Sequence, residues 1–156
     1  MRSSIEDFLY VGAPPEAVYR LVADLAQYAR YAPPNLRCGR ALTSYTDEPG
    51  ARIELRLRLV GPLWQHRVLQ LHALEPPCCA IVGPPDASAF LTRWTLAAEP
   101  PGTVVTISTD LGPPGGLLAP AASLIAWRLT ALARRTHGDV LARLKQVAEQ
   151  DLPARR

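Results

Sequence analysis

The side chains best suited to chemistry fall on one predicted strand, in the stretch Gln65-His66-Arg67-Val68. Side chains along a strand alternate between two faces, so Gln65 and Arg67 share a face with Leu69, and His66 lies on the other. If the leucine points inward, the guanidinium of Arg67 points inward with it. A buried guanidinium is costly unless it is paired or serves a polar ligand. We therefore expect Arg67 either to contact a polar group of a bound molecule or to lie on a solvated face.

Two further polar residues are candidates for contact with a ligand. Thr136 falls on the apolar face of a predicted C-terminal helix, where its hydroxyl can bond either a ligand or a helix carbonyl. Tyr45 lies, with Tyr28, Tyr31 and Asn35, where two short predicted helices meet the sheet. A phenol at that place can act as a general acid or can simply pack.

The composition argues against several classes of protein. The formal net charge of +3 is mild and no basic stripe is interleaved with aromatic residues, so nucleic-acid binding is not expected. The three cysteines lack zinc-binding spacing and are expected to be buried free thiols. His66 and His72 are expected roughly 20 Å apart on one strand, at about 3.3 Å per residue, too far to share a metal. No Ser-His-Asp or Cys-His arrangement and no dinucleotide fingerprint is readable, so no cofactor is expected.

Length and the N-terminal sequence bound the organisation and location of the protein. The 156 residues fit one domain, 1–156, with a core of ordinary size. Residues 1–7 have no apolar core before their acidic members, so no secretory signal is expected. We therefore expect a cytoplasmic protein.

The pattern of apolar residues switches between two periods. After a short apolar strand at residues 8–12, apolar residues recur at helical spacing from Pro15, and a second helical piece covers about 24–31. From residue 36 to residue 111 the period is two, which is typical of strands with one buried face. The clearest strand is at 52–59, and Pro- and Gly-containing turns separate others at about 64–73, 78–82, 90–97 and 103–111.

After Gly115-Gly116 a helical period continues to about Glu149. Its predicted apolar face consists of Leu118, Ala121, Ala122, Ile125, Leu129, Leu132, Thr136, Val140 and Val147. A sheet with one long helix must curl round that helix to bury both apolar faces. The predicted fold class is therefore α+β, a helix-grip: a curved antiparallel sheet of about seven strands around a long C-terminal helix, with two short helices after strand one. The pattern leaves open whether a cavity remains between them or the core packs solid.

Three stretches carry a resemblance to a known superfamily. They are APPEAVYRLVADLAQYARYAPP after the first strand, PGTVVTISTDL in the last strand and HGDVLARLKQVAE near the C-terminus. Together with the layout, they resemble the START-like (SRPBCC) helix-grip superfamily, which includes polyketide cyclases and aromatases, lipid-transfer domains and quinone-binding proteins. The resemblance implies that the two short helices plug one end of the sheet and that a ligand cavity lies between sheet and long helix.

The stretch around Arg67 is similar to the corresponding strand of bacterial polyketide aromatase/cyclases. This resemblance implies that Arg67 binds oxygens of a poly-β-ketone chain and stabilises the enolate or alkoxide of an aldol closure. Gln65 and Thr136 are then expected to orient the substrate, with Tyr45 as an acid. The expected ligand-contacting residues are Leu55, Leu57, Leu69, Trp94, Ile107, Ile125, Leu129, Leu132 and Thr136.

Two functions of different classes fit these expectations. One is an enzyme that cyclises or dehydrates a hydrophobic, polyketide-like molecule, and the other is a non-catalytic carrier of a lipid or isoprenoid quinone. A third possibility comes from the uncharged run between Leu111 and Trp127. An apolar lip near Trp127 is expected to dock a carrier protein, a membrane surface or a second copy of the chain, unless nearby loops cover it.

Overall fold

The order of elements follows the predicted one: a strand, two short helices, six strands and a long helix. The computed structural model describes residues 4–60, 62–86, 90–111 and 119–152, with the side chains of all of these except 59, 60 and 119–129. The elements are β1 (Ser4–Val11), α1 (Pro15–Val22), the 3-10 helix η1 (Leu25–Arg30), β2 (Leu36–Ala41), β3 (Arg52–Val60), β4 (Leu63–Glu75), β5 (Cys79–Gly83), β6 (Leu91–Glu99), β7 (Gly102–Asp110) and α2 (Ala119–Gln150).

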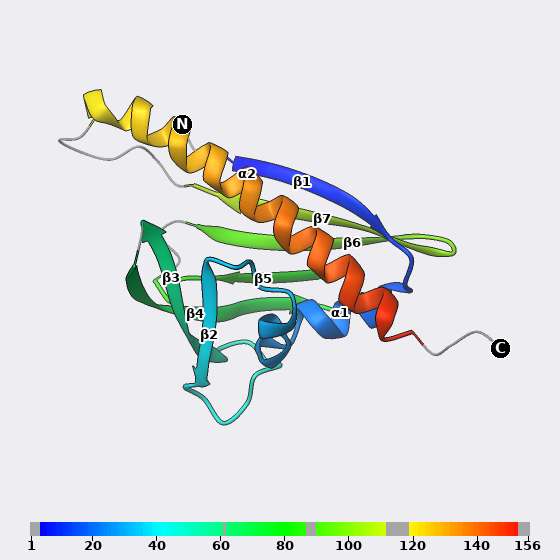
Figure 1. The fold of residues 1–156 in the computed structure, drawn as a ribbon. Helices are drawn as coiled ribbons and strands as arrows, with labels where there is room; N and C mark the ends of the chain where they lie inside the picture. Colours follow the sequence, from blue (N-terminus) through cyan, green and yellow to red (C-terminus); the bar gives the residue numbers. More distant parts are fainter. Residues whose placement is uncertain (1–3, 61, 87–89, 112–118, 153–156) are drawn as a thin grey trace.

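The strands form one seven-stranded sheet in the order β1-β7-β6-β5-β4-β3-β2, with antiparallel neighbours throughout. Helix α2 lies across one face of this sheet and packs chiefly against β1, with lighter contacts to α1 and β7 (Figure 1). We call the face toward α2 the inner face and the opposite face the outer face. The arrangement is a helix-grip α+β fold, as predicted.

The first short helix begins at Pro15, as predicted, and the second, Leu25–Arg30, lies within the predicted range of about 24–31. Pro15 occupies the first turn of α1, where a missing N–H costs nothing, and Glu16 and Arg20 lie at the ends that favour their charges. The second helix is a tighter 3-10 helix, capped by Asp24, whose side chain accepts a hydrogen bond from the Ala26 backbone N–H at 2.9 Å. Helix α1 packs on β6, β7 and α2 at one end of the sheet (Figure 1).

The core lies between the inner face of the sheet and the helices. Trp94 on β6 is 1% exposed and meets the ring of Tyr31 edge-on, with 6.1 Å between ring centroids. The hydroxyl of Tyr31 is satisfied by donating to the backbone oxygen of Leu21 at 2.9 Å. Other fully buried side chains are Val11, Val18, Leu71, Val105 and Leu144.

The buried stripe of α2 is turned relative to the predicted apolar face. The side chains buried against the sheet are those of His137, Val140, Leu141, Leu144 and Ala148. Leu132, predicted to lie on the buried face, is 41% exposed, so its placement there was wrong. The reason is that the stripe follows the contact of α2 with β1, where His137 bonds Asp7. Leu118, Ala121, Ala122, Ile125 and Leu129 lie outside the described side chains.

The cysteines are free, as predicted, but their burial differs. Cys79 is buried and Cys38 is half-buried. Cys78 is exposed, so the expectation of burial was wrong for this thiol, because Cys78 lies in the turn between β4 and β5. None of the helices in the described part of the chain is long and apolar enough to cross a bilayer.

Candidate functional site

A chain of hydrogen-bonded polar side chains lies on the inner face between the sheet and α2. The carboxylate oxygen Oδ2 of Asp7 is 2.9 Å from Nδ1 of His137. On the other side of the imidazole, Nε2 is 2.7 Å from the hydroxyl of Thr109, which is 3.0 Å from the hydroxyl of Thr92. These hydrogen bonds therefore join β1, α2, β7 and β6.

The local sequence explains why these groups meet. On β1 the inward positions are Ile5, Asp7, Leu9 and Val11, so the carboxylate takes the place of an apolar residue in the alternation. Thr109 is paired in register with Ile5 on one side and Thr92 on the other, which places both hydroxyls on the inner face. His137 belongs to the buried stripe of α2 and is 3% exposed.

The chemistry of the partners fixes the direction of the hydrogen bonds. An ionised carboxylate can only accept, so Nδ1 of His137 donates to Asp7 when the imidazole is neutral. Nε2 is then an acceptor and the Thr109 hydroxyl donates to it. The oxygen of Thr109 remains able to accept from Thr92. A carboxylate, an imidazole and a hydroxyl in this order can take a proton from the hydroxyl side and stabilise the resulting imidazolium.

Arg67 lies on the inner face, as its alternation predicts, but it is not enclosed. It is paired directly with Leu55, whose side chain is only 7% exposed. The guanidinium nevertheless is exposed and donates to the Gln65 side chain at 2.9 Å. A long side chain can lay its stem on apolar surface while its charged end stays in water, so the cost of a buried charge does not arise.

Tyr45 lies in the loop between β2 and β3 and is 39% exposed. The loop does adjoin the short helices, because the Leu25 backbone N–H donates to the backbone oxygen of Thr46 at 2.9 Å. The loop of Tyr45 thus lies beside the short helices at the edge of the sheet, and the role of Tyr45 as an acid stays a prediction. Thr136 is half-buried next to His137 on α2.

The apolar residues predicted to contact a ligand fall into three groups. Leu55, Trp94 and Ile107 belong to the buried core, and Leu69 packs against it. Leu57 is half-buried and Leu132 is exposed. The side chains of Ile125 and Leu129 lie outside the described part of the chain, as does that of Trp127 at the predicted lip.

Sequence reasoning missed Asp7, His137 and Thr109. The signal for Asp7 was present, because strict alternation with Ile5 and Leu9 places it inward. The same alternation places Thr109 inward beside Ile107. The pairing with His137 could not be found, since it depends on how α2 is rotated and on contacts across almost the whole chain.

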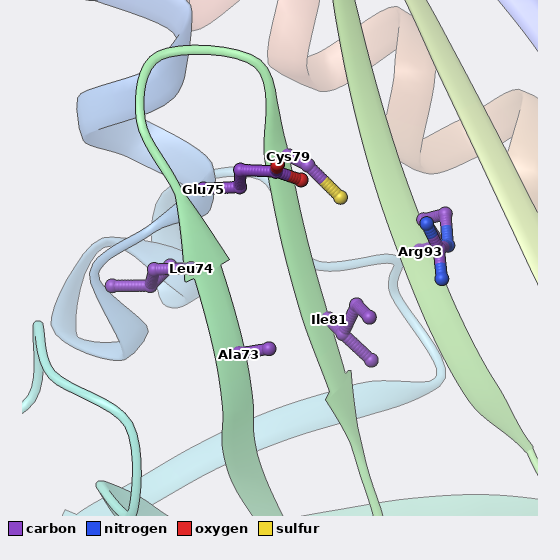
Figure 2. Close-up of a pocket in the computed structure, with 6 residues that line it drawn as sticks. All are labelled: Ala73, Leu74, Glu75, Cys79, Ile81 and Arg93. Carbon is purple, nitrogen blue, oxygen red and sulfur yellow. The ribbon is translucent and has the colours of Figure 1, made fainter.

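A hollow of about 390 Å³ lies beside β4, β5 and β6, lined by Ala73, Leu74, Glu75, Cys79, Ile81 and Arg93. Figure 2 shows Cys79 and Ile81 on β5 with Arg93 on the neighbouring strand β6. Burial raises the pKa of the Cys79 thiol, and the nearby Arg93 lowers it by a smaller amount. A thiol with a raised pKa is a poor nucleophile at neutral pH, so this hollow is a weaker candidate for chemistry than the chain through His137.

Comparison with solved structures places the fold among known ones. The chain is similar to the Zhui aromatase/cyclase from Streptomyces sp. R1128, with 16% identity and a TM-score of 0.73 over 99% of this chain and 98% of that one. It is also similar to the KanY protein, with 18% identity and a TM-score of 0.72 over 96% and 99% of the two chains. A polyketide-cyclase-like protein from Corynebacterium glutamicum matches at 18% identity and a TM-score of 0.66 over 96% and 93%. These likenesses show a shared fold.

No curated protein matches the chain. A family model does match, over residues 3–149, and its description is polyketide cyclase/dehydrase and lipid transport. That match covers nearly the whole sequence, so the chain belongs to the polyketide cyclase/dehydrase and lipid transport family.

Proposed function

We propose that this protein binds a hydrophobic, polyketide-like small molecule between the inner face of the sheet and α2 and promotes its cyclisation or dehydration. The family description and the aromatase/cyclase likeness support this class of ligand. The observation that carries the proposal is the hydrogen-bonded set Asp7–His137–Thr109, in which the imidazole and the hydroxyl are buried. An apolar carrier needs no acid–base group in its core, whereas a cyclase needs one.

The proposed reaction is an aldol closure. A base removes a proton from a carbon between two carbonyl groups, and the enolate carbon forms a bond to a second carbonyl carbon. His137 Nε2 takes up that proton through the hydroxyl of Thr109, and Asp7 stabilises the imidazolium. The same proton returns to the new alkoxide, and loss of water with a second proton transfer gives the dehydrated product.

Arg67 has a separate role in this proposal. Its guanidinium lies on the inner face and is fixed by Gln65, so it can hold a carbonyl or enolate oxygen of the ligand. Leu55 and Leu69 on the same face supply apolar contact. Tyr45 and Thr136 complete the proposed set of polar contacts.

The first experiment is native mass spectrometry of the protein from its producing cells, with identification of any released molecule. The second follows conversion of a linear poly-β-ketone thioester analogue, corrected for the spontaneous reaction. We expect the wild type to accelerate closure and His137→Asn to lose about two orders of magnitude of that acceleration. Arg67→Ala should lose more turnover than binding.

His72→Asn is the matched control, because Nε2 of His72 bonds the backbone oxygen of Pro84 at 2.8 Å, outside the Asp7–His137–Thr109 chain. It should keep the wild-type rate. A protein that retains a lipid or quinone at near-stoichiometric amount and gives no acceleration is a carrier, and the cyclase proposal is then wrong.

A further inference from the structure

The outer face of β2, β3 and β4 carries a row of two arginines and a histidine that is unrelated to the inner face. Arg37 on β2 is paired directly with Arg56 on β3, and Arg56 with His66 on β4. All three side chains are exposed. Their inner-face neighbours Leu55 and Leu57 point the other way, so this row faces away from α2.

A tryptophan ring stands beside this row. The guanidinium carbon of Arg37 is 4.6 Å from the centroid of the Trp64 ring, and that of Arg58 is 5.7 Å from it. Both distances are within the range of attraction between a cation and a ring face. Arg37, Arg56, Trp64 and His66 together line a hollow of about 190 Å³, which we call the Trp64 pocket.

The charges of the Trp64 pocket are not balanced by acids. Like charges directly opposite each other on neighbouring strands destabilise a sheet. Within the described residues, none of Arg37, Arg56 and Arg58 forms an ion pair with a carboxylate. The nearby acid Glu54 pairs with Arg40 instead, at 3.6 Å. Repulsion between the opposed arginines therefore destabilises the sheet here, and a bound anion would reduce that repulsion.

We propose that the Trp64 pocket binds the phosphate group of a phosphorylated ligand. Guanidinium groups match phosphate oxygens in paired hydrogen bonds, and two arginines on neighbouring strands with a histidine on the next suit an anion with three oxygens better than a carboxylate with two. A hollow of about 190 Å³ has room for a phosphate, since a water takes about 30 Å³ of liquid. The Trp64 ring offers apolar surface to the organic part of the ligand.

The test is calorimetric titration with inorganic phosphate and with phenyl phosphate, together with the NMR signal of the Trp64 indole N–H. We expect both anions to bind and to shift that signal, with phenyl phosphate binding more tightly. Arg56→Ala should weaken binding by about tenfold or more, because it removes a charge-assisted contact. Arg37→Ala also removes the contact with the Trp64 ring and should weaken phosphate binding by a similar factor. It replaces Arg56→Ala in the test if that variant does not fold.

Arg52→Ala is the matched control. Arg52 lies on the same strand and face as Arg56, but its guanidinium donates to Gln70 at 2.8 Å and does not line the pocket. It should keep wild-type affinity. An equal loss in Arg52→Ala and Arg56→Ala would mean diffuse attraction to a basic face and would overturn the proposal, as would no binding by the wild type at millimolar phosphate.

Melting temperature provides an independent readout. Without phosphate, Arg56→Ala should melt at or above the wild-type temperature, since it removes one of two opposed like charges. Phosphate should raise the melting temperature of the wild type more than that of the variant at the same concentration. A large drop without phosphate would assign Arg56 a structural role and contradict a site kept for binding. Vesicles containing phosphatidic acid then separate a lipid source of the phosphate from a soluble one.

Discussion

Asp7 and His137 lie 130 residues apart in the chain, and a hydrogen bond of 2.9 Å joins them. Asp7 is on the first strand and His137 is midway along the last helix, so this bond fixes how α2 sits on β1. His137 is 4% exposed at its side chain and Asp7 is 31% exposed. The imidazole is therefore shielded from water, while the carboxylate keeps contact with it, and the bond from Nδ1 to the carboxylate defines the tautomer of His137.

Asp7→Asn should separate catalysis from folding. The amide oxygen can still accept from Nδ1, so the free energy of unfolding should fall by only about 1–2 kcal/mol. The negative charge that stabilises the imidazolium is lost, so closure of the thioester analogue should slow by about tenfold or more. Urea unfolding and single-turnover rates measure the two effects. If the rate of closure falls only as far as the loss of folded protein explains, Asp7 has no role in proton transfer.

Thr109→Val should cost stability because it leaves Nε2 of His137 without a partner in a buried place. The expected loss is about 1–3 kcal/mol in the free energy of unfolding, measured by urea denaturation. Thr109→Ser keeps the hydroxyl and should lose less. The comparison is with Thr92→Val. The hydroxyl of Thr92 bonds that of Thr109 at a partly buried place, so the loss of stability should be smaller. Equal losses in the three variants would show that the hydroxyl of Thr109 contributes nothing specific.

The sequence predicted the fold well because its signals are local. The alternation at 52–59 and Pro15 in the first turn of a helix each specify an element without reference to the rest of the chain. Alternation also placed Arg67 on the inner face correctly. It could not show that the guanidinium of Arg67 would be exposed, since exposure depends on what covers that part of the sheet.

The candidate site depended on contacts that are distant in sequence. Leu132 was placed on the buried face of the long helix because a helical period alone cannot fix which way the helix is turned. The rotation that buries His137 and Leu141 and leaves Leu132 exposed is set by packing on β1. The Asp7–His137 pair follows from that rotation and so was not predictable from the sequence pattern.

Two glycines should respond in opposite ways to alanine. A Cβ at Gly102, at the start of β7, would clash with the backbone oxygen of Val11 and with the ring of Tyr10. Gly102→Ala should therefore destabilise by about 1–3 kcal/mol. A Cβ at Gly138 on α2 meets nothing within 4 Å, so Gly138→Ala should stabilise by about 0.5–1 kcal/mol. Thermal and urea unfolding measure both, and a stabilising Gly102→Ala would contradict the close approach of β1 to β7.

The three thiols should react with iodoacetamide at different rates. Cys78 is exposed and should be alkylated first. Burial raises the pKa of Cys38 to about 11, so at pH 8 less than about 1% of this thiol is the reactive thiolate. Its rate should still be rising with pH at pH 10. Peptide mass spectrometry after timed labelling separates the sites, and fast labelling of Cys38 at pH 7 would contradict its burial.

Glu149 should contribute to the acid sensitivity of the fold. Its Oε1 accepts from Lys145 Nζ at 2.6 Å and from the Gly12 backbone N–H at 2.8 Å, and these bonds lower the pKa of the carboxyl in the folded protein. A carboxyl whose folded pKa is lowered stabilises the fold above its unfolded pKa of about 4.3, and that stabilisation is lost as the pH falls through the folded pKa.

Glu149→Gln should therefore flatten part of the loss of stability between pH 5 and pH 3, while lowering stability at pH 7. Urea unfolding across that range measures the effect. The control is Glu99→Gln, at an exposed carboxylate at the end of β6. Because the side chain of Glu149 is 36% exposed, solvent weakens the interaction and the difference between the two curves should be modest. Parallel curves for wild type and Glu149→Gln would mean that the bonds from Lys145 and from the Gly12 backbone N–H do not hold the carboxylate in solution.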